Sequence, residues 1–533
     1  MSGTDPRRWL RDARRAFARL PALRLSRIPD APALPVRDPW PGDAARGARL
    51  LKGEFEHLGV VVPLRPGGWT DAEAPEVLRC AVHGFGWLRD LRALGTPAAL
   101  LRARALVGDW ISAVPAERLL DRPDVVGARI AAWLSHYDFI AASGDDSFRQ
   151  RLMGRLVTDA RSLAAALPTE ELDVRALTAL KGLVAAAVAL PDHAAFLTRA
   201  LRFLPQEIAR QVLPDGCHAE RSPSAQLAAL QELAEIRSML QAAQVQLPPS
   251  LSQAIERMGP GLRLFRHGDG GLALFNGSKE LSPILIETVL SQCPRGGRPL
   301  SGLAEGGFQR LQAGRSALIV DCGAPAAAGI DRFAHAGTLS LELSVGKDRM
   351  IVNCGSYPGA GAEWHDAMRS TAAHSTLTIA DTNSSELKPN GLGRRPSVVA
   401  VQRQEANGAH WLEASHDGWK KPFGATHRRR LYMAESGEDI RGEDAVEAEL
   451  PQPFAVRFHL HPNVSASLQQ DGEAVLLRLP AAGGWRIRAD GARVSLEESV
   501  YLGGPEPRRT EQVVLTGFAD GPQQVKWAIT KVG

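Results

Sequence analysis

The sequence has few cysteines and no long apolar run. Its 533 residues include five cysteines, an odd number, with no pair at the spacing of a metal knuckle. This pattern excludes a disulfide framework and favours buried free thiols. The longest apolar stretch, Gly182 to Leu190, stops at Pro191 and is too short to span a bilayer. The segment from Met1 to Pro21 is rich in arginine and its apolar residues are interrupted, so we expect no secretory signal.

The chain also lacks a strong charge of one sign. It carries 63 Lys and Arg against 59 Asp and Glu, and aromatic residues are only 6% of the total. A nucleic-acid-binding protein is usually more basic, with aromatics between its basic residues, so we do not expect nucleic acid as a partner. Basic side chains do cluster locally, at Arg7, Arg8, Arg11, Arg14, Arg15 and Arg19, and again at His427, Arg428, Arg429 and Arg430. Each cluster is either a solvated surface or a docking site for anionic sugars or a membrane surface.

A chain of this length is too long for one core, and the spacing of its apolar residues changes once along the sequence. From about residue 75 to residue 258 it is rich in Leu and Ala at helical spacing, with short breaks at Pro, Asp and Gly. One helix is expected to have Ser222 as its N-cap and Pro223 at its first position. Past residue 261 short alternating segments predict strands. Helices that precede strands predict separate α and β domains, with a boundary near residue 260.

The alternation past residue 261 is clearest in two segments. In residues 339–345, Leu and Val alternate with Ser340, Glu342 and Ser344, and in residues 456–461 apolar residues alternate with Arg457, His459 and His461. A period of two predicts strands with one face buried and one face exposed.

Four short motifs carry a resemblance to a known family. Residues 334–340 read Ala-His-Ala-Gly-Thr-Leu-Ser, and residues 351–355 read Ile-Val-Asn-Cys-Gly. Residues 369–376 read Arg-Ser-Thr-Ala-Ala-His-Ser-Thr, and residues 215–223 read Asp-Gly-Cys-His-Ala-Glu-Arg-Ser-Pro. In order and spacing these segments resemble the heparinase II/III lyases.

The resemblance implies an α+β protein of two domains, an incomplete (α/α) toroid followed by an antiparallel β-sandwich. We expect an Arg- and Pro-rich arm over residues 1–60, the toroid over residues 61–260 and the sandwich over residues 261–533.

The resemblance also implies a structural zinc ion, which family members bind through two histidines and an aspartate. His335 and His374 match the histidines, and Asn353 stands at the aspartate position. A neutral amide is a poorer zinc ligand than a carboxylate. Cys354 lies next door, but adjacent strand residues point to opposite faces. The alternative is that the two histidines only form hydrogen bonds within the sandwich.

Elimination on a uronic acid requires neutralisation of the carboxylate, a base for the neighbouring proton and an acid for the leaving oxygen. Related lyases use Asn or His for the first task and Tyr and His for the others. This sequence has Ala225 at the tyrosine position and Phe333 at a histidine position. The replacement candidates are His218, Glu220 and Tyr137 for proton transfer and Arg175 and Arg369 for the sugar carboxylate. His218 and Tyr137 have an alternative role in packing, and Arg369 has the alternative of bracing the sandwich through a carboxylate or a backbone carbonyl.

A further family-like segment, residues 415–419, reads Ser-His-Asp-Gly-Trp. Related proteins often have Tyr at its last position. Trp419 keeps a flat ring for stacking on a sugar but loses the phenol, and His416 is a second candidate for contact with the polymer. This change suggests that binding is retained more securely than catalysis.

The leading hypothesis is a lyase that cleaves an acidic, uronic-acid-containing polysaccharide by β-elimination in the cleft between toroid and sandwich. The alternative is a catalytically inactive carbohydrate-binding or envelope-associated protein of the same fold. The N-terminus and the free cysteines favour the cytoplasm, whereas the family resemblance favours the periplasm.

Overall fold

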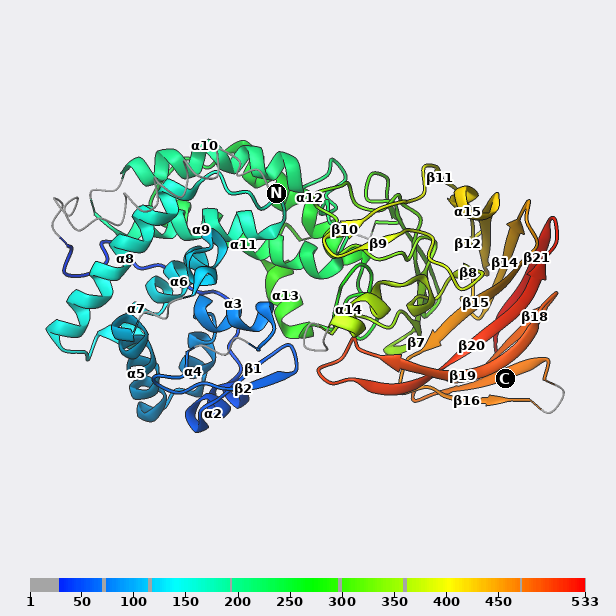
Figure 1. The fold of residues 1–533 in the computed structure, drawn as a ribbon, viewed down its shortest axis with the longest axis horizontal. Helices are drawn as coiled ribbons and strands as arrows, with labels where there is room; N and C mark the ends of the chain where they lie inside the picture. The colour runs from blue at the N-terminus through cyan, green and yellow to red at the C-terminus, as the bar shows by residue number, and fades with distance from the viewer. Residues whose placement is uncertain are drawn as a thin grey trace, which may run out of the picture. The chain divides into compact units, whose positions relative to one another are not determined.

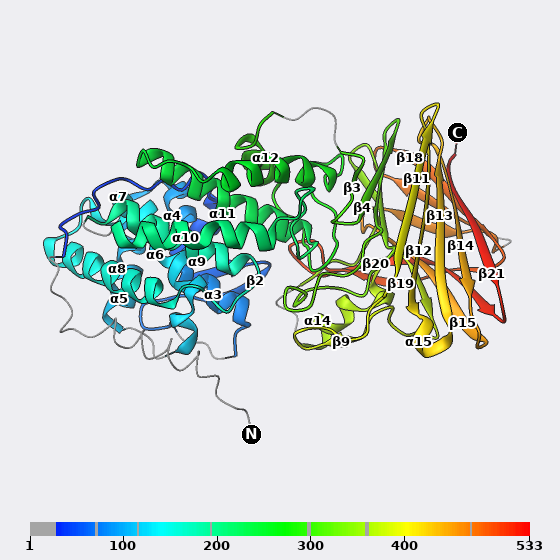
Figure 2. The ribbon, with the colours of Figure 1, turned by 90° about the horizontal axis from the view of Figure 1, so that it is seen from above.

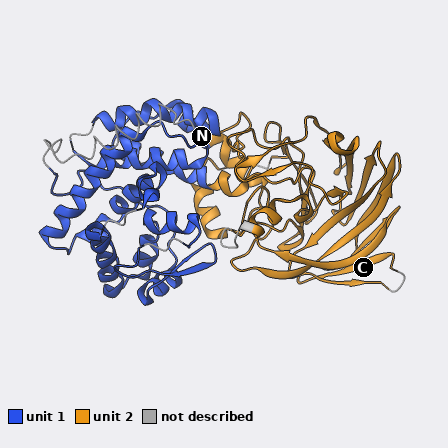
Figure 3. Ribbon diagram, in the orientation of Figure 1, with its two compact units in different colours: residues 1–211, 228–255 blue, residues 212–227, 256–533 orange. Residues whose placement is uncertain are grey.

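The structure is a computed structural model that describes residues 28–69, 73–113, 117–191, 194–295, 300–357, 362–469 and 472–532. Helices come first along the chain and antiparallel strands follow (Figure 1), which confirms the predicted α+β architecture. The chain divides into two compact units (Figure 3). Unit 1 comprises Met1–Gln211 and Ala228–Ile255, and unit 2 comprises Val212–Leu227 and Glu256–Gly533. The arginine cluster from Arg7 to Arg19 lies outside the described residues.

Unit 1 is built from helices and one small hairpin. The helices are α2 (Ala44–Lys52), α3 (Glu76–Gly84), α4 (Leu88–Leu94), α5 (Pro97–Ala113), α6 (Pro123–Ser135), α7 (Tyr137–Ala141), α8 (Asp146–Ala166), α9 (Val174–Ala189) and α10 (Ala194–Gln211), with the 3₁₀ helix η2 (Arg118–Asp121). Helices α11 (Pro223–Ala242) and α12 (Pro249–Leu264) each contribute to both units, and β1 (Glu54–His57) pairs with β2 (Val60–Pro63). No described helix is long and apolar enough to cross a membrane.

Small residues set the packing of unit 1. A β-carbon at Gly182 of α9 would overlap the backbone of Gly127 in α6, so the two helices meet at their glycines. In the same unit, Phe85, Trp110 and Trp133 pack with ring centroids 5.1 to 5.7 Å apart. The predicted start of α11 is confirmed, because the helix begins at Pro223 and the Ser222 hydroxyl accepts a hydrogen bond from the Ala225 N–H at 3.4 Å.

Unit 2 is a sandwich of two antiparallel sheets. One sheet has the order β11-β12-β13-β14-β21-β18-β17-β16, and the other has the order β19-β20-β15-β7-β6-β5-β4-β3, with β8 paired to β15. Their bounds are β3 (Gly302–Leu303), β4 (Phe308–Ala313), β5 (Ser316–Asp321), β6 (Leu341–Val345), β7 (Asp348–Val352), β8 (Leu377–Ile379), β11 (Val399–Ala406), β12 (Ala409–Trp419), β13 (Ala425–Met433), β14 (Asp439–Glu447), β15 (Gln452–Leu460), β16 (Ser465–Leu468), β17 (Ala474–Leu479), β18 (Gly483–Asp490), β19 (Arg493–Tyr501), β20 (Arg508–Ala519) and β21 (Gln523–Lys531).

Strands far apart in the sequence lie side by side in this sandwich. Figure 2 shows β21, at the end of the chain, next to β14, and the register pairs Trp527 with Gly442. Side chains from both sheets, including Leu343, Leu431 and Trp485, fill one buried apolar core. The remaining elements of the unit are the short pair β9 (Leu387–Lys388) and β10 (Gly391–Leu392), with α13 (Pro283–Ser291), α14 (Ala362–Arg369), η3 (Thr371–Ala373) and α15 (Lys420–Phe423).

The prediction of half-exposed strands is wrong for β6. All five of its residues are buried, and the Glu342 side chain is 0% exposed. The reason is that the polar face of β6 is covered by the segment that follows α12, where His267 bonds to both Ser344 and Glu342. The alternation therefore identified the strand correctly but not the environment of its second face.

Candidate functional site

The two motif histidines meet in unit 2. His335 lies in the loop between β5 and β6, and His374 directly follows η3. Nδ1 of His335 is 3.0 Å from Nε2 of His374, and the rings are perpendicular with centroids 5.1 Å apart. Gly337 makes this approach possible, because a β-carbon there would lie 2.7 Å from Cδ2 of His374.

The hydrogen bonds assign the tautomers of this pair. The carbonyl of Ser370 accepts from Nδ1 of His374 at 2.7 Å, so the proton of a neutral His374 sits on Nδ1. Its Nε2 is then the acceptor and Nδ1 of His335 is the donor. Burial lowers the pKa of His374 to about 4, and burial together with His374 lowers the pKa of His335 well below its usual range. Both rings are therefore neutral near pH 7.

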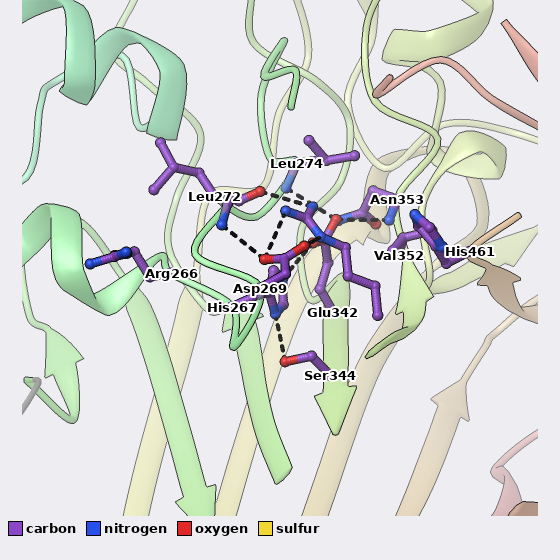
Figure 4. A network of polar contacts seen from close by, with 12 residues as sticks. Arg266, His267, Asp269, Leu272, Leu274, Glu342, Ser344, Val352, Asn353 and His461 are labelled. Atoms are coloured by element: carbon purple, nitrogen blue, oxygen red, sulfur yellow. Dashed lines mark hydrogen bonds and ion pairs between the residues drawn. The ribbon is translucent and has the colours of Figure 1, made fainter. Parts of the chain in front are cut away.

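Asn353 is held by a second network, shown in Figure 4. Its Nδ2 donates to Oε1 of Glu342 at 3.3 Å, and its Oδ1 accepts from the Ser375 N–H at 3.0 Å. Oε1 of Glu342 also accepts from the N–H groups of Asn353 at 2.9 Å and Leu274 at 3.1 Å. Oε2 of Glu342 lies 2.9 Å from Nε2 of His267. An aspartate in place of Asn353 would face Glu342 without a proton to donate, which explains the amide at this position.

These residues do not fit the zinc site that the resemblance implies. A structural zinc ion needs four ligands, nearly always thiolates, imidazoles or carboxylates. Here the third position is a neutral amide whose oxygen already accepts from Ser375, and the two histidines bond to each other. Within the described parts of the chain, no three His, Cys, Asp or Glu side chains are grouped as metal ligands. Cys354 points to His459 at 3.5 Å, and burial raises its pKa to about 12.

The motif at residues 215–223 belongs to the same unit as the histidines. Nδ2 of Asn276 donates to the carbonyl of Arg221 at 2.9 Å, and its Oδ1 accepts from the His335 N–H at 3.1 Å. Asn276 thus ties the two motifs together. Arg221 itself has a left-handed backbone, with φ 56°, and is fixed by an ion pair with buried Asp321 and by the ring of Phe308, 4.8 Å away.

The candidates for proton transfer stay predictions, and the structure shows their surroundings. His218 is 0% exposed, and its Nδ1 accepts from the Glu220 N–H at 3.2 Å. The Glu220 carboxylate lies 3.8 Å from the same nitrogen. Tyr137 belongs to unit 1, where burial raises its pKa and its hydroxyl lies 3.4 Å from the Asp30 carbonyl. A raised pKa opposes the use of this phenol as a base.

The two arginines proposed to bind a sugar carboxylate already bond to protein oxygens. Arg369 is 1% exposed and donates to the carbonyls of Ala334, Lys388 and Gly391 at 2.7 to 3.0 Å. Arg175 lies in unit 1 and binds Asp173 through two nitrogens, each at 2.8 Å. The geometry favours the structural alternative for Arg369, and the Arg175 guanidinium is already paired within unit 1.

Trp419 and His416 do not form an exposed surface, contrary to the prediction. Trp419 is 0% exposed and its indole donates to Thr382 at 3.0 Å, and His416 is 2% exposed. The register shift between the two residues in β12 turns both side chains into the sandwich. They pack there beside His427, whose Nε2 lies 2.7 Å from Asp444, a carboxylate that also binds Arg429. Of the basic cluster at residues 427–430, two members are therefore core residues.

Sequence reasoning missed Glu342, His267 and Asn276. The alternation gave no signal that Glu342 is buried, because polar residues at every second position of a strand normally mark the exposed face. His267 and Asn276 lie in the irregular segment between α12 and α13, where no periodicity indicates contact partners.

Comparisons with known proteins agree with this fold. A model of the heparinase II/III N-terminus matches residues 138–291, and a model of the heparinase II/III-like C-terminal region matches residues 295–528. FtsZ-localized protein C of Caulobacter vibrioides is 31% identical over 525 residues, which cover 93% of this chain and 89% of that protein.

Solved structures of heparinases share the fold at low identity. The crystal structure of heparinase III superposes with a TM-score of 0.75 at 13% identity, covering 98% of this chain and 89% of that chain. Heparan sulfate lyase HepC from Pedobacter heparinus gives a TM-score of 0.59 at 16% identity, covering 98% of this chain and 87% of that chain. The motifs, the fold and the family models agree, and the chain belongs to the heparinase II/III-like family of polysaccharide lyases.

Proposed function

We propose that this chain is a non-cleaving member of the heparinase fold that localises with FtsZ. The observation that carries the proposal is the similarity to FtsZ-localized protein C, which extends over nearly the full length of both proteins. Such a match supports a shared function better than the similarity to the heparinases does. The heparinases are only 13 to 16% identical, which is evidence of a shared fold alone.

The side chains support the loss of cleavage. Ala225 and Phe333 carry no titratable group where related lyases have Tyr and His. His335, in the motif at residues 334–340, has a pKa held low by burial and by His374, so it is a weak base. Arg369 and Asn353 bond to the protein itself.

The test is to follow a fluorescent fusion of the chain in cells with labelled FtsZ. We expect the two signals to overlap and the fusion to disperse when FtsZ is depleted. In vitro, the purified chain should sediment with FtsZ polymers and stay in the supernatant when FtsZ is kept unpolymerised. A fusion that remains diffuse beside intact FtsZ structures, with no co-sedimentation, would contradict the proposal.

The second candidate function is β-elimination of an acidic polysaccharide. It is favoured by family membership and by Nε2 of His335, which makes no hydrogen bond to the residues that the structure describes. The test is incubation with heparin, alginate and a bacterial exopolysaccharide, followed by the ultraviolet absorbance of unsaturated ends. A rise that His335→Ala removes would favour the lyase, and a flat trace on all three polymers would exclude it for these substrates.

A further inference from the structure

The outward face of the β11–β16 sheet carries two rows of side chains that cross the strands. Residues in register on neighbouring strands share a face, which makes each row continuous. The first row runs from Gln404 through Trp411, Tyr432, Arg441 and Ala528 to Arg488. The second row runs from Glu413 through Arg430, Glu443 and Lys526 to Asp490.

These rows surround a hollow of about 620 Å³. Trp411, which is 40% exposed, and Tyr432 form one wall, with ring centroids 5.2 Å apart and an angle of 48° between the rings. Farther across the sheet, Arg488 lies in register with Ala528, and Lys526 lies in register between Glu443 and Asp490. The lining carries four cationic and two anionic side chains, so the hollow has an aromatic side and an excess of positive charge.

Some cationic side chains of the hollow are paired with carboxylates, and others are not. Arg430 bonds to Glu413 at 2.6 Å and to Glu443 at 3.2 Å, and Arg441 bonds to Asp439 at 2.7 Å. By contrast, Arg488 and Lys526 are exposed and make no hydrogen bond or ion pair to any residue in the described ranges. Two cations beside an open aromatic surface are complementary to a chain that carries both flat apolar faces and anionic groups.

We propose that this hollow is a binding site for a polysaccharide that carries carboxylate groups. Trp411 and Tyr432 would stack on sugar rings, and Arg488 and Lys526 would bind the carboxylates. An acidic peptide fits less well, because the hollow lies in the middle of a sheet whose backbone groups are already paired between strands. An extended peptide is usually held by free backbone groups at a sheet edge, which this hollow does not offer.

The proposal is independent of cleavage and of localisation with FtsZ, and calorimetric titration tests it. The ligands are alginate oligomers, dextran as a neutral polysaccharide and poly-L-glutamate as an acidic peptide. The variants are Trp411→Ala and the double variant Arg488→Ala with Lys526→Ala. The matched control is Arg509→Ala, an exposed arginine on β20 of the other sheet.

We expect saturable binding of alginate that weakens as salt is added, with dextran and poly-L-glutamate bound at least about tenfold more weakly. Trp411→Ala and the double variant should each weaken alginate binding about tenfold, while the affinity of Arg509→Ala stays within about twofold of that of the wild type. The double variant should also weaken the salt dependence. Circular dichroism melting confirms that each variant is folded. Three results would overturn the proposal. They are the absence of saturable alginate binding, an alginate affinity within twofold of the wild type in Trp411→Ala or in the double variant, and an equal affinity for poly-L-glutamate.

Discussion

Asn353 shows how one residue can preserve a family's fold while it changes the chemistry at a site. Its amide donates to Glu342 and accepts from Ser375, two tasks that a carboxylate cannot perform together near neutral pH. Glu342 in turn organises the N–H groups of Leu274 and Asn353 and the ring of His267. The position that resembles a metal ligand therefore acts as a brace within the sandwich.

We predict that Asn353→Asp destabilises the protein by about 1–3 kcal/mol at pH 7.5, because two buried carboxylates then face each other. Glu342 and burial raise the folded-state pKa of the new carboxyl, so its penalty is greatest at high pH and shrinks as the pH falls. Urea unfolding of the variant and the wild type at pH 7.5 and pH 5 measures this difference.

The matched control is Asn463→Asp, at an exposed asparagine whose oxygen accepts from Arg508. A new carboxylate there meets a cation, and we expect a change of less than about 0.5 kcal/mol. Equal stabilities of Asn353→Asp and Asn463→Asp at pH 7.5 would refute the role assigned to the Asn353 amide.

At the scale of elements, strands β14 and β21 depend on one glycine. The indole of Trp527 lies against the backbone of Gly442, and a β-carbon at Gly442 would overlap Cζ2 and Cε2 of the ring. The same indole donates to Asp444 at 2.8 Å and packs on Phe458 with centroids 4.9 Å apart. The ring is held on several sides and has little room to shift.

We therefore predict that Gly442→Ala costs about 1–3 kcal/mol in the free energy of unfolding. The control is Gly484→Ala in β18 of the same sheet, where the nearest atom to a new β-carbon is Cβ of Val532 at 3.6 Å. Guanidinium unfolding followed by tryptophan fluorescence compares the two. A Gly442→Ala protein as stable as Gly484→Ala would mean that Trp527 relaxes without cost.

At the scale of the whole molecule, buried neutral histidines make stability depend on pH. Burial lowers the pKa of His83 and His374 to about 4 and that of His459 to about 3. The unfolded chain takes up these protons near pH 6.5, whereas the folded protein resists them until about pH 4. Acid therefore favours the unfolded state over this window, and each group costs roughly 1.4 kcal/mol per pH unit in its middle.

The prediction is a steep fall in the free energy of unfolding between pH 6.5 and pH 4, measured by urea titrations at several pH values. His374→Gln should reduce the slope of the free energy of unfolding against pH by the contribution of about one proton. Asn463→Gln is the control, because it replaces an exposed asparagine without adding or removing a titratable group and should leave the slope unchanged. Equal slopes in the wild type and His374→Gln would contradict the assignment of His374 as a buried neutral group.

The sequence by itself determined the order of helices and strands, the start of α11 at Pro223 and the family, because these depend on local periodicity, capping and short motifs. The tertiary structure decided which polar residues are buried and with whom. Glu342, Trp419 and His416 look exposed in a strand pattern, yet long-range packing covers them. Partners such as His267 for Glu342 and Asn276 for His335 are far apart along the chain, and only the folded sandwich brings them within hydrogen-bond distance.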